Sequence, residues 1–283
     1  MYDQCYVTIC TGIKYLKGVL LLNESLKLVN SIYPLICLVP STIDKKTISC
    51  LHDKNIDIKI IENGIIINDN ILKNNIQGVN EHWNKTFFKF YVFGLTEFKK
   101  IVFLDADMII IKNIDELFEK PHLTACNAGG LYPGQEDWKG MNSGLMVIEP
   151  DKKITETLID ILNKIENISR GYGDQDIINK FYPDWYKQNE LHLSEHYNLF
   201  YSYANYYGKK YGYTLDGDEP VRVIHFVGRI KPWMKETEIP LKWRIRKFLS
   251  LIKHYKEVLG YKTSLQSKID EYYKKIEVLI GEL

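Results

Sequence analysis

Three apolar, β-prone runs alternate with two amphipathic segments over about the first sixty residues of this chain. The predicted strands cover residues 6–10, 34–39 and 56–61, and the predicted helices cover residues 14–28 and 44–51. This order opens a Rossmann-like parallel sheet, which binds ligands at the carboxyl ends of its strands. No Gly-x-Gly-x-x-Gly follows the first strand, which disfavours a dinucleotide-dependent oxidoreductase.

Two carboxylates interrupt an apolar stretch over residues 101–111. Asp105 and Asp107 stand one residue apart, with four apolar residues before them and four after them. Burying such carboxylates unpaired costs several kcal/mol each, and no Lys or Arg adjoins the pair. Both side chains can lean toward one side of an extended segment, and the small Ala106 leaves room between them. We therefore predict that the pair binds a hard divalent cation.

The bare Asp-x-Asp triplet has two other interpretations. It fits a solvated turn between two strands, although a surface turn does not need hydrophobic runs on both sides. Phosphatases of the haloacid dehalogenase class also carry Asp-x-Asp at the end of an apolar strand. Their motif continues into a Gly-Thr turn and usually opens the domain, whereas Met108 follows here and a third of the chain precedes. These differences argue against the phosphatase.

Further along the chain, polar residues accompany other predicted elements. An Asn-Ser-Gly triplet at 142–144 precedes a predicted strand, Asp174 lies where a helix opens, and His225 lies in a strand over residues 221–228. Each has an ordinary explanation as turn chemistry, a helix N-cap or a packed core histidine. Helices are also predicted over residues 84–98, which include Lys89, and 151–168. Residues 63–80 have weak periodicity and are assigned no role.

Composition describes a folded globular protein with ample core. The chain has 283 residues, of which 45% are hydrophobic, and its 37 basic and 36 acidic residues nearly balance. This balance implies no overall positive potential that would attract nucleic acid. The five cysteines are odd in number, scattered and without zinc-ligand spacing, so free thiols in a reducing compartment are expected. No basic leader or membrane-spanning run is evident, so we predict a cytoplasmic protein.

Short motifs from both halves of the chain, taken in order, resemble the glycogenin-like glycosyltransferases of family 8. The resemblance covers about residues 5–235. The motifs are Val7-Thr8-Ile9-Cys10-Thr11 with Tyr15-Leu16-Lys17-Gly18, Phe103-Leu104-Asp105-Ala106-Asp107 with Asn113-Ile114-Asp115-Glu116-Leu117-Phe118, Asn142-Ser143-Gly144, Gly173-Asp174-Gln175, and His225-Phe226-Val227-Gly228 with Lys231-Pro232-Trp233.

This resemblance implies an α/β fold of the type called A, a single Rossmann-like domain with a mostly parallel sheet over residues 1–239. Residues 240–283 would form a C-terminal helical extension. The implied metal ligands are Asp105, Asp107 and His225. The implied UDP-sugar contacts are Ile9, Thr11 and Tyr15 at the uridine, Ala106 in the Asp-x-Asp loop, Lys89, Asn142, Asp174 and Gln175 at the sugar, and Gly228 and Lys231 at the pyrophosphate.

The implied activity is manganese-dependent transfer of a hexose from a UDP-sugar to a carbohydrate or protein hydroxyl with its α configuration kept, and glucose is the favoured hexose. Imidazole beside two carboxylates suits manganese better than magnesium, which is the alternative ion. Asp174, Gln175 and Lys231 are the candidate catalytic residues. The chain departs from the family pattern at Gly12, where Asn is common, and at Gly171, where an acidic residue is expected.

Two other function classes stay open on the sequence. One is a metal-dependent phosphohydrolase or nucleotidyltransferase, although the turn after the first strand is not the Gly-rich basic loop expected of the latter. The other is a silent sugar-nucleotide-binding protein, which would typically have lost a carboxylate, the histidine or the lysine. UDP-galactose is an alternative donor. Self-glucosylation at Tyr201 is an alternative to a separate acceptor, since the surrounding residues resemble the self-modified region of glycogenin.

Beyond Pro240, basic residues accompany apolar ones at helical spacing up to Leu259. This pattern predicts an amphipathic helix, which we favour as packed on the domain over bound to a membrane surface. Truncation after Pro240 is expected to spare nucleotide binding. A homodimer is compatible with the sequence.

Overall fold

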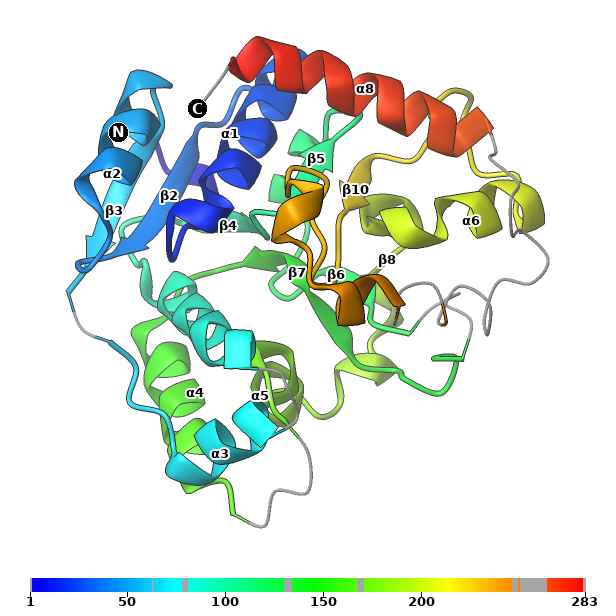
Figure 1. Ribbon diagram of the computed structural model, residues 1–283. Coiled ribbons are helices and arrows are strands. Elements are labelled where there is room, and N and C mark those ends of the chain that lie inside the picture. The colour runs from blue at the N-terminus through cyan, green and yellow to red at the C-terminus, as the bar shows by residue number, and fades with distance from the viewer. Residues whose placement is uncertain are drawn as a thin grey trace.

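The computed structural model describes residues 2–62, 64–77, 81–129, 134–166, 171–245, 249 and 264–281. Figure 1 shows a central twisted sheet with α1, α2 and α8 on one side and α3, α4 and α5 on the other. This arrangement confirms the predicted α/β class with a mostly parallel sheet.

The larger sheet has seven strands in the order β3-β2-β1-β4-β7-β6-β8. Neighbouring strands are parallel except where β7 pairs with β4 and with β6. The strands are β1 Gln4–Ile9, β2 Leu35–Pro40, β3 Asp57–Ile61, β4 Lys100–Leu104, β6 Ala125–Asn127, β7 Met141–Ile148 and β8 His192–Leu193.

A second, three-stranded sheet has the order β5-β10-β9. Its strands are β5 Met108–Ile110, β9 Leu199–Phe200 and β10 Val223–His225. β10 runs antiparallel to β5 and parallel to β9. Since β4 belongs to the larger sheet and β5 to the smaller one, the chain passes between the two sheets at residues 105–107.

The helices confirm most of the sequence prediction. They are α1 Ile13–Leu28, α2 Lys45–Asp53, α3 Asp69–Gln77, α4 Lys152–Lys164, α5 Asp174–Phe181, α6 Ala204–Lys210 and α8 Ser264–Ile280, with 3-10 helices η1 Glu81–Gly94, η2 Asp115–Glu119, η3 Trp185–Lys187, η4 Asn189–Leu191, η5 Glu195–Tyr197, η6 Tyr201–Tyr203 and η7 Glu236–Glu238.

Two local predictions are corrected. The helix expected over residues 84–98 is a 3-10 helix that ends at Gly94, and residues three apart on it eclipse one another. The Asn-Ser-Gly triplet at 142–144 is not a turn before a strand but part of β7. Ser143 Oγ donates to Asp174 and Asn142 Oδ1 accepts from Asn198, so these turn-forming residue types occupy a buried strand with partners on neighbouring elements.

The larger sheet separates two hydrophobic clusters because successive strand residues point to opposite faces. Tyr6 and Cys10 contribute to the cluster under α1, whereas Cys5 and Val7 contribute to the cluster under η1 and α4. The carboxylate of Asp115 ties the end of α1 to β1, since it accepts hydrogen bonds from Tyr6 Oη at 2.7 Å and Ser31 Oγ at 2.7 Å. Asp115 therefore belongs to the framework of the fold.

The C-terminal helix α8 packs against α1 and α6. Its buried residues recur every three or four positions and join the cluster under α1; they are Leu265, Ile269, Tyr273, Ile276 and Ile280. Their burial in this core argues against the expectation that truncation after Pro240 spares nucleotide binding. The boundary at 239 stays a prediction, and most of the helix predicted after Pro240 lies outside the described residues. None of the described helices is long and apolar enough to span a membrane.

Candidate functional site

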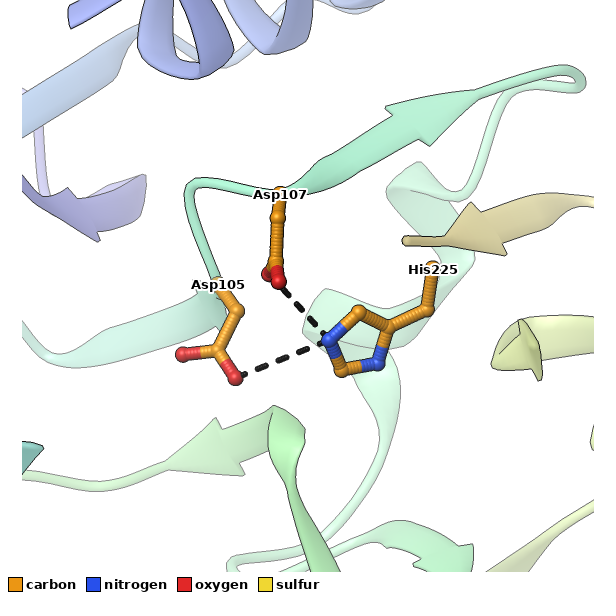
Figure 2. Close-up of side chains that lie close together, drawn as sticks. All are labelled: Asp105, Asp107 and His225. Atoms are coloured by element: carbon orange, nitrogen blue, oxygen red, sulfur yellow. Dashed lines mark ion pairs between the residues drawn. The ribbon is translucent and has the colours of Figure 1, made fainter. Parts of the chain in front are cut away.

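The Asp-x-Asp segment and His225 meet where the two sheets adjoin. His225 Nε2 lies 3.2 Å from Asp107 Oδ1 and 3.9 Å from Asp105 Oδ2. Figure 2 shows both carboxylates facing the imidazole ring from the turn between β4 and β5. The resemblance implied these three residues as ligands of one metal ion, and the structure brings them together. β10 carries His225 in the smaller sheet, with Met108 of β5 as its antiparallel partner.

Backbone hydrogen bonds fix the turn that carries the two carboxylates. The amide of Asp105 donates to Gly144 O at 2.8 Å, and the amide of Phe226 donates to Asp107 O at 2.8 Å. Gly144 also has a steric role, because a Cβ at this position would lie 2.6 Å from Cε1 of His225. The glycine therefore admits the imidazole ring against β7, which the sequence did not reveal.

His225 is oriented by a residue that sequence analysis did not single out. Asn198 is 1% exposed, and its amide nitrogen donates to Asn142 Oδ1 at 2.8 Å. Its Oδ1 lies 2.8 Å from His225 Nδ1 and accepts a hydrogen bond from it. This arrangement puts the proton on Nδ1 and leaves the Nε2 lone pair directed at the carboxylates. The sequence offers one indication of this role: Asn198 is a polar residue in an otherwise apolar and aromatic segment.

Two carboxylates and an imidazole nitrogen suit a divalent cation. One ligand atom from each of Asp105, Asp107 and His225 lies within 4.8 Å of the others, and this is the one such cluster found among the described residues. Their oxygen and nitrogen donors match manganese, while magnesium prefers oxygen alone. The donor set and its imidazole tautomer therefore fit the ion that the sequence implied.

A buried lysine links the Asp-x-Asp turn to α5. Lys89 Nζ lies 3.0 Å from Asp105 Oδ1 and 2.7 Å from Asp174 Oδ2, and it donates to Ser143 O at 3.0 Å. Burial opposes the charge on Lys89, but the two carboxylates outweigh it and raise its pKa to about 12. Burial likewise opposes ionisation of Asp174, whose pKa is nevertheless lowered by Lys89 and by its hydrogen bond with Ser143.

The neighbouring carboxylate Asp105 responds differently. Burial raises its pKa and the charge of Asp107 adds to this effect, although Lys89 and His225 oppose it. The interior therefore resists full ionisation of this carboxylate, and additional positive charge at the turn would stabilise the ionised form.

Lys231 approaches the same cluster from the loop after β10. Its Nζ pairs with Asp107 Oδ2 and donates to Phe226 O at 2.7 Å. Burial would raise the pKa of Asp107, but Lys231 and His225 outweigh it and lower that pKa. Gly228 precedes Lys231 with φ of 94°, a left-handed conformation that glycine adopts without strain. The loop therefore brings a cation beside the carboxylates.

The end of β1 and the first turns of α1 border the Asp-x-Asp turn. Strand β1 ends at Ile9, and Thr11 lies two residues further along the chain. Burial raises the pKa of Tyr15, and the charges of Asp107 and Asp105 raise it further. Gly18 allows close packing here, because a Cβ would lie 2.3 Å from Ala106 O and 2.8 Å from the Trp233 ring. The predicted motifs around Tyr15, Ala106 and Trp233 are thus packed against one another.

The remaining predicted residues lie on β7 and α5. Gln175 Oε1 accepts from the amide of Ser143 at 3.2 Å, and Asn142 Oδ1 accepts from the amide of Gly144 at 2.9 Å. Asn142 is 8% exposed, and its Oδ1 also accepts from Asn198 Nδ2 at 2.8 Å. The structure therefore connects the sugar-side candidates to the carboxylate cluster through β7.

Comparison with known proteins agrees with this geometry. The family model described as glycosyl transferase family 8 matches residues 6–237, which include every residue of the candidate site. The chain belongs to glycosyl transferase family 8. Its similarity to human glycogenin-1 is 32% identity over 241 residues, covering 82% of this chain and 63% of the relative.

Another relative in the family has a name that states its donor and acceptor. A putative UDP-glucuronate:xylan alpha-glucuronosyltransferase 3 of Arabidopsis thaliana is 31% identical over 249 residues, covering 86% of this chain and 36% of the relative. The chain spans between about a third and two thirds of the length of these curated relatives. Family membership therefore leaves the donor and acceptor open.

Solved structures show the same fold. The apo form of the glycosyltransferase GlyE of Streptococcus pneumoniae aligns with a TM-score of 0.56 at 19% identity, covering 96% of this chain and 64% of that chain. The galactosyltransferase LgtC in complex with donor and acceptor sugar analogs aligns with a TM-score of 0.54 at 15% identity, covering 91% of this chain and all of that chain.

Proposed function

We propose that this protein is a retaining glycosyltransferase that moves a hexose from a UDP-sugar to a hydroxyl acceptor in a manganese-dependent reaction. The observation that carries the proposal is the convergence of Asp105, Asp107 and His225 beside Lys231. A nucleoside diphosphate leaving group needs its developing charge neutralised by cations held in place before the reaction. Family membership supports the reaction class over a phosphohydrolase or nucleotidyltransferase, and the intact charged cluster argues against a silent relative.

Each residue has a role in this proposal. Asp105, Asp107 and His225 hold manganese, which supplies Lewis-acid stabilisation of the pyrophosphate. Lys231 exchanges its contact with Asp107 for a phosphate oxygen, assisted by the backbone at Gly228. Ile9, Thr11 and Tyr15 surround the uridine, and Ala106 leaves space beside the ribose and phosphates. Lys89, Asn142, Asp174 and Gln175 position the hexose.

Retention is supported by how the carboxylates are occupied. Asp174 Oδ2 is shared between Lys89 at 2.7 Å and Ser143 Oγ at 2.7 Å, so it is held as an ion-pair partner and not as a free nucleophile. A covalent double displacement needs a carboxylate close to the anomeric carbon, whereas inversion needs a base behind it. We therefore favour attack on the same face as the departing phosphate, which accepts the acceptor's proton while Asp174 and Gln175 hold the sugar.

Glucose is the proposed donor sugar and a separate carbohydrate or protein hydroxyl is the proposed acceptor. The hydroxyl of Tyr201 donates to Asp270 Oδ1 at 2.6 Å and accepts from Gln266 at 3.2 Å, both on α8. Burial and then the bond to Asp270 raise the pKa of Tyr201 to about 12. These contacts disfavour Tyr201 as the self-modified residue. The five cysteines are free, which fits a cytoplasmic location.

A donor panel tests the proposal. UDP-glucose, UDP-galactose, UDP-glucuronate and UDP-xylose are incubated with the protein and Mn²⁺, without and with hydroxyl acceptors, and free UDP and the intact protein mass are measured. We expect UDP release from at least one donor, with loss of activity on chelation and recovery with Mn²⁺. Turnover that is indifferent to chelator, or hydrolysis of phosphate monoesters with no release of UDP, would contradict the proposal.

The Asn198 contact gives a separate prediction about the metal site. Asn198→Ala removes the acceptor that fixes the imidazole tautomer, and changes of this kind typically weaken metal binding by about 10- to 100-fold. Electron paramagnetic resonance of free Mn²⁺ during titration of the nucleotide-free protein measures this affinity. Asn68→Ala is the control, because the Asn68 amide donates to the backbone of Asn163 at 3.0 Å and of Ile165 at 3.2 Å and not to the His225 site. Equal Mn²⁺ affinity in the wild type and Asn198→Ala would refute the role of Asn198.

A further inference from the structure

The α3 helix places a fully buried amide next to the segment that leads into α5. Asn75 is 0% exposed, and its side chain binds both peptide groups of Tyr172. Its Nδ2 donates to Tyr172 O at 2.9 Å, and its Oδ1 accepts from Tyr172 N at 2.8 Å. The same Nδ2 donates to Asn84 Oδ1 at 2.7 Å on η1. Asn75 thus joins α3, η1 and the start of α5 in one polar cluster.

This contact has a specific geometry. An amide that donates to and accepts from one residue's backbone restrains that residue in both position and rotation, as a neighbouring strand would. Tyr172 stands two residues before Asp174, and little chain lies between them to absorb a displacement. A buried hydrogen-bonding side chain costs desolvation free energy, so its full satisfaction here indicates a well-defined native arrangement.

The restraint continues from Tyr172 to the sugar-side residues. The amide of Gly173 donates to Asp176 Oδ2 at 2.9 Å, and the amide of Asp174 donates to Thr86 Oγ1 at 3.2 Å. Thr86 and Lys89 lie three residues apart on the 3-10 helix and share a face, so both reach Asp174. The start of α5 is therefore held on one side by η1 and on the other by Asn75.

We propose that Asn75 is a positioning residue for the donor sugar. By clamping Tyr172, it fixes Asp174 and Gln175 relative to the sugar, so that α3 contributes to the preference for a UDP-sugar over UDP alone. This gives a role to a segment that carries none of the family motifs. The inference rests on the proposed function, in which Asp174 and Gln175 contact the hexose while the uridine and metal contacts lie elsewhere.

A purely structural role for Asn75 predicts a different result. Loss of packing would lower stability and weaken UDP and UDP-glucose binding together. Loss of positioning leaves UDP binding nearly intact, because Asn75 lies on the α5 side and not at the Asp107 and Lys231 cluster. Only the extra affinity supplied by the sugar, and the turnover that depends on sugar orientation, should fall.

The experiment measures Kd for UDP and for UDP-glucose, each with Mn²⁺, in the wild type and three variants. Asn75→Ala removes the clamp, and Asn84→Ala removes only the acceptor that orients the Asn75 amide. Asn74→Ala is the control, because Asn74 is only partly buried and its side chain bonds within α3, to Asn70 O at 2.8 Å. Asn84→Ala retains the clamp itself and serves if Asn75→Ala does not fold.

We expect Asn75→Ala to leave the UDP affinity unchanged and to lower the affinity ratio of UDP-glucose to UDP by roughly three- to tenfold, the effect of about one lost hydrogen bond. Asn84→Ala should shift the ratio in the same direction by less, and Asn74→Ala should not shift it. Parallel weakening of both ligands, or an unchanged ratio in a folded Asn75→Ala, overturns the positioning role alone. Failure of the wild type to bind UDP overturns the proposed function and this inference with it.

Discussion

Asp107→Asn is expected to reduce Mn²⁺-dependent UDP release by roughly a thousandfold or more, since metal stabilisation of the leaving group supplies several kcal/mol. Asp107 contacts both His225 and Lys231, so its neutralisation removes one metal ligand and leaves Lys231 without its counter-ion. The substitution preserves side-chain shape, so we expect a cooperative unfolding transition close to that of the wild type.

The matched control for this variant is Asp151→Asn. Asp151 caps α4 by accepting from the amide of Lys153 at 2.9 Å, and asparagine caps helices about as well as aspartate. This control should keep wild-type UDP release and Mn²⁺ affinity. If Asp107→Asn retained full activity, or if the control lost activity equally, the assignment of the metal site would be wrong.

Lys89→Met is expected to destabilise the fold by about 3–5 kcal/mol, the usual effect of removing one partner from a buried ion pair. Lys89 is 4% exposed and is the cation that Asp105 and Asp174 share. Methionine fills a similar volume but leaves the carboxylates uncompensated. Urea denaturation in the presence of a chelator measures the loss in unfolding free energy. Lys164→Met is the control, because the ion pair of Lys164 with Asp160 is exposed and should contribute less than about 1 kcal/mol.

The loss caused by Lys89→Met should depend on pH. The folded-state pKa of Lys89 is raised from 10.5 to about 12. Its contribution to the free energy of unfolding is therefore fully present below pH 10.5 and is lost as pH rises through about 12. The pKa of Asp174 is lowered from 3.8, so its contribution is present above pH 3.8 and is lost as pH falls below it. The difference between wild type and variant should be largest between these limits. A loss no greater than that of Lys164→Met at neutral pH would contradict the ion-pair account.

The larger sheet could be predicted because its information is local. Apolar runs of strand length alternate with helical periodicity, and Asp44 caps α2 by accepting from Thr47 N at 2.8 Å. The Asp-x-Asp pair was recognisable because buried carboxylates between apolar runs need a compensating charge. Short motifs then connected His225 and Lys231 to that pair across more than a hundred residues.

The parts that could not be predicted depend on contacts distant in sequence. Nothing near His225 indicates that β10 pairs with β5 in a separate sheet. Gly144 resembles a turn glycine, yet its importance is the space it leaves for an imidazole from another strand. Asn75 and Asn198 belong to a chain rich in asparagine, so only the folded structure distinguishes a buried amide with several partners from a solvated one.

The most direct test of the central claim is the anomeric configuration of the first transfer product. Proton NMR of the glycoside formed from an α-linked UDP-sugar distinguishes the two anomers by their coupling constants. A retaining mechanism predicts an α-linked glycoside, formed only with Mn²⁺ present and absent from Asp107→Asn. A β-linked glycoside would contradict the retaining mechanism and the roles proposed for Asp174 and Gln175.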